Sequence, residues 1–254
     1  MESPCPLSRR SFAVLSVAAA AGVALSTARA EPGARPVVVE LFTSQGCSSS
    51  PPADRLLGEL SQWPGVIALS LNVDYWDYLG WRDTLGSRDC AQRQRDYAAR
   101  RGDNLVYTPQ IVINGADQMV GSDRRAVLTA IARESARDPA GVVAVSLHSG
   151  EHEVSVEIAA APDGGLRQEA TIWMVSLVPQ AVVEIGRGEN AGRTIAYTNA
   201  VRKIIPAGTW HGQPMGLSLP KPAIMSEGTS CTALLQADGT GPILGAALLA
   251  GSAA

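Results

Sequence analysis

Alternating apolar and polar stretches over the first half of the chain predict strands and helices in regular succession. Residues 37–42 form a short apolar run rich in β-branched side chains, which is typical of a buried strand. Residues 51–62 begin with two prolines and then place leucines at helical spacing, which predicts a helix. Residues 66–73 are again mostly apolar. This succession predicts two parallel strands joined by a right-handed helical crossover.

The pattern continues with a polar helix, a hairpin and a further helix. Residues 87–101 are polar and arginine-rich, as in an exposed helix. Asn114 and Gly115 separate two apolar runs, which is the strongest short signal for a hairpin. Helical spacing returns over residues 123–138. The complete order is that of a thioredoxin-like α/β domain, which we expect over residues 36–138.

After residue 138 the pattern changes to short strand-like runs separated by Gly, Pro and Asn. No long run with helical spacing is found there. The runs cover residues 142–147, 154–159, 171–178, 181–185, 194–197 and 232–235. They predict a small all-β, sandwich-like domain over residues 141–250, following the α/β domain.

The N-terminal segment has the pattern of a signal peptide. Arg9 and Arg10 precede an apolar run rich in Ala and Val, and residues 28–30 (Ala-Arg-Ala) form a small-x-small cleavage pattern. The paired arginines favour the twin-arginine export route. The alternative is an N-terminal membrane anchor, but the apolar run is too short to span a bilayer. We therefore expect residues 1–30 to be removed and the mature protein to be periplasmic or secreted.

Charge and composition narrow the classes of partner. The formal net charge is −3 and the chain has no basic block, so nucleic acid is not an expected partner. No second apolar stretch predicts a membrane span after cleavage. His148, His152 and His211 do not have metal-ligand spacing, and we expect no metal or cofactor. The expected partner is a protein or a small thiol of the cell envelope.

The run that leads from the first strand into the first helix carries Cys47, the main candidate for chemistry. Free N–H groups and the dipole at a helix N-terminus stabilise a thiolate, and Ser50 can add a hydroxyl donor. A Cys-x-x-Ser sequence forms a mixed disulfide but has no second thiol to release it. An outside thiol, Cys90 or Cys231 would have to do so. The alternative is a buried, inert Cys47.

Two further residues are candidates to support Cys47. Glu40 lies on the preceding strand, and it is either an acid–base group behind the thiol or a carboxylate bonded to backbone at the rim of the sheet. Pro109 follows Thr108 just before the hairpin, and it is either a cis-proline that faces Cys47 or an ordinary trans-proline at the start of a strand. The order of elements, taken with Cys47, favours the cis form.

Aromatic residues gather in the loop that follows the second strand. Tyr75, Trp76, Tyr78 and Trp81 all lie within residues 74–83. The carboxyl ends of parallel strands meet at one edge of a sheet, where α/β folds bind ligands. These side chains would there line a recognition surface for a peptide or an envelope protein. The alternative is that they pack between the two domains.

Three motifs stand out together: residues 39–49 (VELFTSQGCSS), 74–81 (DYWDYLGW) and 107–110 (YTPQ). They resemble a secreted bacterial family, the domain of unknown function 1223, in the thioredoxin-like superfamily. Residues 188–193 look like a further family segment, so the resemblance covers nearly the whole mature chain. It implies a thioredoxin-like fold and export. The family usually shows Cys-Ser-Ser-Cys-Pro-Pro-Ala, whereas this chain has Ser50 in place of the second cysteine.

These observations support two hypotheses of function. In the first, the chain is an adaptor or chaperone of the cell envelope that binds through the aromatic loop without turnover. In the second, Cys47 exchanges disulfides in the manner of a thiol-disulfide oxidoreductase or isomerase, or accepts a small thiol such as glutathione. Pro109 would then fix the backbone of the partner, and Ser50 would support the thiolate. The absence of a second cysteine favours the first hypothesis.

Overall fold

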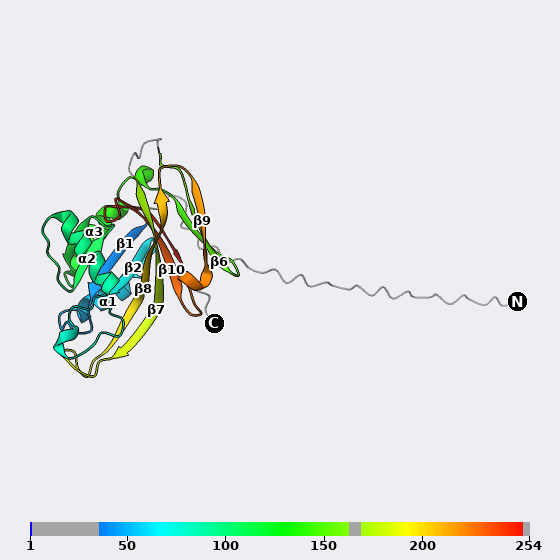
Figure 1. The fold of residues 1–254 in the computed structure, drawn as a ribbon. Coiled ribbons are helices and arrows are strands. Elements are labelled where there is room, and N and C mark those ends of the chain that lie inside the picture. The colour runs from blue at the N-terminus through cyan, green and yellow to red at the C-terminus, as the bar shows by residue number, and fades with distance from the viewer. Residues whose placement is uncertain (2–35, 163–168, 251–254) are drawn as a thin grey trace.

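The computed structural model describes Met1, residues 36–162 and residues 169–250 (Figure 1). The cleavage pattern and paired arginines of the expected signal peptide lie outside the described residues. The described chain is a sheet-rich α/β structure with an eight-stranded mixed sheet and a second, three-stranded sheet. Among the described helices, none is long and apolar enough to cross a membrane.

The strands and helices predicted over the first half of the chain are present, and longer strands than predicted follow them. The elements are β1 (Val37–Thr43), α1 (Pro51–Leu60), β2 (Val66–Asn72), η1 (Asp77–Leu79), α2 (Arg88–Arg101), β3 (Gln110–Ile113), β4 (Asp117–Val120), α3 (Arg124–Ser135), η2 (Pro139–Gly141), β5 (Val145–Ser149), β6 (Glu153–Ile158), β7 (Ala170–Glu184), β8 (Thr194–Trp210), β9 (Met215–Pro220), α4 (Lys221–Ile224), β10 (Ser230–Ala237) and β11 (Ile243–Leu249).

The large sheet has the order β11-β10-β7-β8-β2-β1-β3-β4. Strand β1 runs parallel to β2, which confirms the predicted parallel pair, and antiparallel to β3. Strands β3 and β4 form the predicted hairpin. Its turn residues Asn114 and Gly115 both have positive φ, as a tight hairpin turn of this kind requires.

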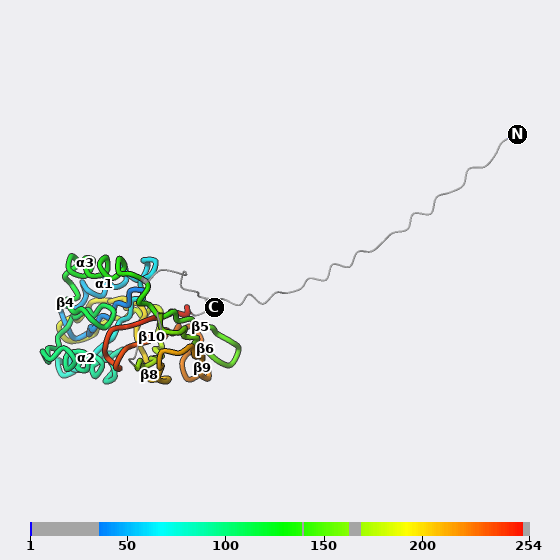
Figure 2. Tube along the Cα trace, turned by 90° about the horizontal axis from the view of Figure 1, so that it is seen from above, coloured from blue at the N-terminus to red at the C-terminus, as the bar shows by residue number. Residues whose placement is uncertain are grey.

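Helices cover both faces of the β1–β4 part of the sheet (Figure 2). Val39 and Leu41 of β1 pack with residues of α1 and α3, whereas Val38 and Phe42 pack in a core that includes α2 residues. This division follows from the period of two in a strand, which sends alternate side chains to opposite faces. Strand β1 is therefore buried on both faces and fixes the start of the loop that carries Cys47.

The second half of the chain differs from the expected separate sandwich. Strands β7, β8, β10 and β11 continue the large sheet beyond β2, and the second sheet contains β5, β6 and β9. The two sheets pack together around a core that includes Leu147, Ile172 and Trp210. The runs at residues 171–178 and 181–185, which the pattern separates, are one strand, β7. Strands β9 and β11 were not predicted.

Strand β8 joins the two parts of the large sheet through the parallel pair Ser70 and Ala200. The neighbouring residue, Asn199, has a φ of +47°, a conformation that Asn tolerates better than most residues. Its side-chain amide donates a hydrogen bond to the Ala68 carbonyl at 2.9 Å. The Asn199 side chain therefore adds a hydrogen bond between β8 and β2 next to their pairing at Ser70 and Ala200. No local pattern in the sequence reports this long-range contact.

Candidate functional site

Cys47 lies in the loop between the end of β1 and the start of α1. Its side chain is buried, with 5% of its surface exposed, and its thiol is free. The Sγ atom donates a weak hydrogen bond to the Thr108 carbonyl at 3.5 Å. The peptide bond between Thr108 and Pro109 is cis, which confirms the expected geometry. The thiol and the cis-proline therefore lie side by side at the edge of the sheet.

Ser50 is the N-cap residue of α1, yet its hydroxyl makes no capping bond. The residue is fully buried, and Oγ has no hydrogen-bond partner among the described residues. The hydroxyl contact to the Cys47 thiol that the sequence suggested is therefore not formed. What Ser50 does contribute is a backbone bond, from its N–H to the Cys47 carbonyl at 3.2 Å.

A buried acid that the sequence analysis missed, Asp54, lies one helical turn after Ser50. Its Oδ1 accepts a hydrogen bond from the Thr43 hydroxyl at 2.8 Å, and its Oδ2 is buried without a partner among the described residues. Burial, reinforced by the charge of Asp83, raises the pKa of Asp54 to about 8. The signal that could have found it is its spacing, because Asp54 falls on the same helical face as Leu57.

Tyr197 of β8 faces the same buried region as Asp54. Its hydroxyl has no hydrogen-bond partner among the described residues. Burial raises its pKa, and the nearby Asp54 and Asp83 raise it further. At neutral pH, Asp54 and Tyr197 are therefore mainly protonated.

Glu40 is engaged elsewhere, in a buried ion pair with Arg93 of α2. The Arg93 Nε atom lies 2.6 Å from Glu40 Oε1, and the Tyr97 hydroxyl donates to Glu40 Oε2 at 2.5 Å. Gln236 of β10 in turn donates to the Tyr97 oxygen at 2.9 Å. Both carboxylate oxygens thus accept from side chains, rather than from backbone at the rim as one of the two alternatives for Glu40 held. The network ties β1 to α2 and β10 rather than to the thiol.

The other two described thiols are deeply buried in two different apolar cores. Cys90 packs with the α2 side of the sheet, and Cys231 packs between the two sheets. Burial raises the pKa of each thiol to about 12. Both are free and neither is bonded to Cys47. In this conformation they are packing residues, and neither is placed to resolve a disulfide on Cys47.

Three of the four aromatic candidates are anchored around the Cys47 loop by polar contacts. The Trp76 indole donates to the Thr108 hydroxyl at 2.8 Å, and the Trp81 indole donates to the Gln45 side chain at 2.8 Å. Tyr75 donates to the Gln94 side chain on α2 at 3.1 Å. These three residues therefore lie around the Cys47 loop and are held there by hydrogen bonds.

The fourth candidate, Tyr78, points outward from this aromatic loop. It is 78% exposed and stacks on Trp76 with 13° between the ring planes. The loop thus divides into buried anchors and one exposed ring. The sequence analysis offered a recognition surface or packing between the two domains, and neither alternative describes all four aromatic side chains.

Exposed apolar side chains also flank the Thr108–Pro109 step on other elements. Leu105 and Val106 lie on the loop that leads to it and are 58% and 39% exposed. Val120 ends β4 and is 49% exposed, and the next residue donates its N–H to the Pro109 carbonyl at 2.9 Å. We call Tyr78, Leu105, Val106 and Val120 the apolar rim.

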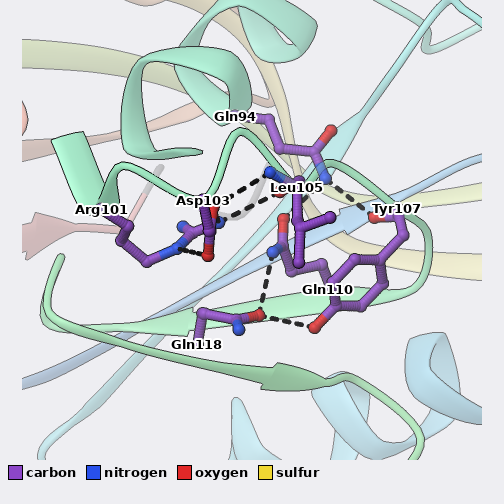
Figure 3. A network of polar contacts seen from close by, with 7 residues as sticks. All are labelled: Gln94, Arg101, Asp103, Leu105, Tyr107, Gln110 and Gln118. Atoms are coloured by element: carbon purple, nitrogen blue, oxygen red, sulfur yellow. Dashed lines mark hydrogen bonds and ion pairs between the residues drawn. The ribbon is translucent and has the colours of Figure 1, made fainter. Parts of the chain in front are cut away.

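A network of polar contacts supports the loop that carries Leu105 (Figure 3). Asp103 accepts a hydrogen bond from the Leu105 N–H at 3.0 Å and is paired with Arg101. Gln94 donates to the Tyr107 carbonyl at 2.8 Å, and the Tyr107 hydroxyl donates to Gln118 at 2.6 Å. The loop is thus bonded at both ends, to α2 and to β4.

The connection between β7 and β8 also reaches the Cys47 loop. The side-chain amide of Asn190 donates to the carbonyls of Gln45 and Cys47, each at 2.9 Å. The Ser48 N–H donates to the Glu189 carboxylate at 3.3 Å. The sequence analysis singled out residues 188–193 only as a segment that looks like part of a known family. Its role at the loop follows from the tertiary structure.

Comparisons with known proteins place the chain in a family. The sequence model of the family described as "Protein of unknown function (DUF1223)" matches residues 38–236. The crystal structure of protein AGR_C_4864 from Agrobacterium tumefaciens is 34% identical, with a TM-score of 0.75, over 88% of this chain and 98% of that one.

A second solved structure resembles this chain in fold. HBP35 of Porphyromonas gingivalis is 12% identical, with a TM-score of 0.64, over 87% of this chain and 77% of that one. No curated protein matches. Because the family model matches residues 38–236, the chain belongs to the DUF1223 family.

Proposed function

We propose that this protein is an exported, thioredoxin-fold binding module that captures an extended segment of an envelope protein beside Cys47 and Pro109. Export rests on the signal-peptide pattern of residues 1–30. The thioredoxin-like assignment is supported by the strand order β2-β1-β3-β4 and by helices on both faces of these strands. The partner would bind without turnover, as an adaptor or chaperone does.

The apolar rim is the observation that carries this proposal. Large apolar side chains are normally buried, and those left together at a surface mark binding sites for proteins or other apolar ligands. The rim comes from three separate elements, the aromatic loop, the loop before Pro109, and β4. An extended apolar segment of a partner can contact several of these side chains at once.

The rim is also preorganised. Leu105 is held through Asp103, and Tyr78 rests on Trp76, which is bonded to Thr108. Fixing a binding surface before the partner arrives reduces the entropy lost on binding. A surface of this kind suits recognition of an unfolded or extended chain, whose own ordering already costs free energy.

Replacing the two most exposed rim residues tests the proposal. We expect Tyr78→Ser with Leu105→Ser to weaken binding of a reduced, S-carboxymethylated model polypeptide by about tenfold, because both contacts with apolar side chains are lost. The dissociation constant would be measured by fluorescence anisotropy on the mature protein.

The matched control is Trp63→Ser, since Trp63 is an exposed aromatic residue, 43% exposed, beyond the end of α1 and away from the rim. This variant should bind as the wild type does. Equal affinities for the rim variant and the wild type would overturn the proposal, as would an equal loss in both variants.

A second candidate function, monothiol exchange, is favoured by the position of Cys47 at the start of α1. The thiolate of Cys47 would attack one sulfur of a partner disulfide, so that a mixed disulfide forms and the other sulfur leaves as a thiolate that takes up a proton. Ser50 has no thiol to reverse the step, so an outside thiol must release the partner.

Adduct formation with cystine separates this function from binding alone. If exchange occurs, Cys47→Ser should abolish the mass increase of a mixed disulfide, whereas Cys90→Ser and Cys231→Ser should leave it unchanged, because burial keeps those thiols protonated. The adduct would be measured by intact-protein mass spectrometry at pH 7. Absence of an adduct on the wild type would leave binding as the function and remove exchange.

A further inference from the structure

The loop that carries Cys47 has weak bonds of its own. The Cys47 N–H donates to the Ser44 carbonyl at 3.2 Å, and the Ser50 N–H donates to the Cys47 carbonyl at 3.2 Å. The thiol contact to Thr108 is long, and the Ser50 hydroxyl does not cap α1. The start of the loop is held more firmly, because the Gln45 N–H donates to Asp83 Oδ2 at 2.8 Å and the Gly46 N–H donates to Ser44 Oγ at 3.0 Å. The weakly bonded part is therefore the segment around Cys47.

Asn190, which lies 143 residues further along the chain than Cys47, donates hydrogen bonds to this segment. It is fully buried, and its amide group donates to two carbonyls of the loop, those of Gln45 and Cys47, with bonds of 2.9 Å that are shorter than the two 3.2 Å backbone bonds made by the Cys47 and Ser50 N–H groups. Without Asn190 the Gln45 carbonyl would lose this donor, and the Cys47 carbonyl would keep the longer bond from the Ser50 N–H.

The segment that carries Asn190 is itself held against the aromatic loop. A Cβ atom at Gly186 would lie 3.2 Å from the Trp81 ring, and one at Gly188 would lie 3.4 Å from the Trp81 Cβ atom. Gly188 also has a φ of +80°, which favours glycine. Trp81 in turn donates to Gln45. The segment between β7 and β8, the aromatic loop and the Cys47 loop are therefore connected by direct contacts.

We propose that Asn190 is a positioning residue for Cys47, which closes the Cys47 loop against Thr108 and so limits access to the thiol. The inference deepens the proposed function, since it concerns the same edge of the sheet. The site is then completed by a residue from the second half of the chain. A partner therefore reaches the Cys47 thiol when the segment between β7 and β8 releases this loop.

Alkylation of the mature protein by iodoacetamide tests the inference without any partner. We expect Asn190→Ala to raise the alkylation rate of Cys47 by at least about fivefold, because both carbonyls lose the Asn190 bond, the Cys47 carbonyl keeps the longer Ser50 bond, and the loop opens locally. The rates of Cys90 and Cys231, followed by peptide mass spectrometry in the same sample, should stay low. A variant that keeps one donor, Asn190→Ser, should give an intermediate rate.

The matched control is Asn199→Gly. Asn199 lies in β8, and its side-chain amide donates a comparable hydrogen bond to the Ala68 carbonyl, which this variant removes. Glycine suits the positive φ at this position, and the bond lies away from Cys47. The Cys47 rate should not change in this control. An unchanged Cys47 rate in Asn190→Ala would overturn the inference, and so would a rise shared by all three thiols, which would report general unfolding.

This result is separable from that of the rim variants. The alkylation rate depends on the Cys47 loop alone, whereas binding of the model polypeptide depends on the apolar rim. A failure of the rim experiment with a positive Asn190 result would refute the binding function and leave the positioning role intact. The reverse result would refute the positioning role alone.

Discussion

Replacing Arg93 by methionine should lower the free energy of unfolding by about 3–5 kcal/mol, the loss expected when one partner of a buried ion pair is removed. Arg93 and Glu40 are 6% and 1% exposed, so the remaining carboxylate would have no compensating charge and no water. The Arg93 guanidinium also bonds the Tyr97 hydroxyl at 2.8 Å and lies over the Trp173 ring. Urea unfolding followed by circular dichroism would measure the change.

The comparison that isolates burial is Arg124→Met. Arg124 pairs with Glu59, but both side chains are 55% exposed, so water replaces the lost partner. We expect a change below about 1 kcal/mol for this variant. A double variant, Glu40→Met with Arg93→Met, should recover much of the loss, since no unpaired charge then remains. A loss in Arg93→Met no larger than that in Arg124→Met would contradict the assignment of Glu40 to a structural ion pair.

The second large effect is a dependence of stability on pH that comes from Asp54. Burial raises the pKa of Asp54 in the folded protein to about 8, from an ordinary value of 3.8. Between these two values the folded state holds a proton that the unfolded state has lost. Stability should therefore fall as the pH rises from about 4 to about 8, and the contribution of this group should be constant above that window.

The variant Asp54→Asn removes this titration and keeps an uncharged side chain that can still accept from Thr43. Compared with the wild type, the variant should gain stability steadily between pH 5 and pH 8, by an amount on the order of a few kcal/mol. Thermal unfolding at a series of pH values would measure it. Asp83, whose pKa burial also raises, is present in both proteins and gives both the same direction of change.

Parallel pH profiles for the two proteins would show that Asp54 is ionised in the fold, contrary to this expectation. The Asp54 result also bears on the site, since Asp54 lies one turn after Ser50 in α1. A neutral acid there means that Asp54 adds no negative charge behind the Cys47 loop at pH 7. Nearby Arg55 acts in the opposite direction, toward ionisation, but by less than burial does.

The fold of the first half could be predicted because its signals are local. Apolar runs, leucine spacing and the Asn114–Gly115 turn report on residues that are neighbours in the sequence. The full lengths of strands β7 and β8 were harder to predict from the sequence, because these strands are partly exposed and their pairing joins segments that lie apart in the chain. A strand such as β8 becomes recognisable when its partners are known, and those partners are β7 and, at Ser70, β2.

The candidate site likewise has features that could be predicted from the sequence and features that depend on tertiary contacts. The sequence by itself determined that Cys47 stands between a buried strand and a helix, that Pro109 precedes the hairpin, and that Ser50 replaces a second cysteine. These are properties of short segments, read from spacing and residue type.

Only the tertiary structure decided which groups surround that cysteine. In the folded chain Glu40 pairs with Arg93, and Asp54 is buried, which keeps its carboxyl neutral. Asn190 donates a hydrogen bond to the carbonyl of Cys47. The physical reason is that burial and hydrogen bonding depend on contacts between segments 50 to 150 residues apart, as the separations of 53 for Arg93 and Glu40 and 143 for Asn190 and Cys47 illustrate. Periodicity along a chain carries no record of such contacts.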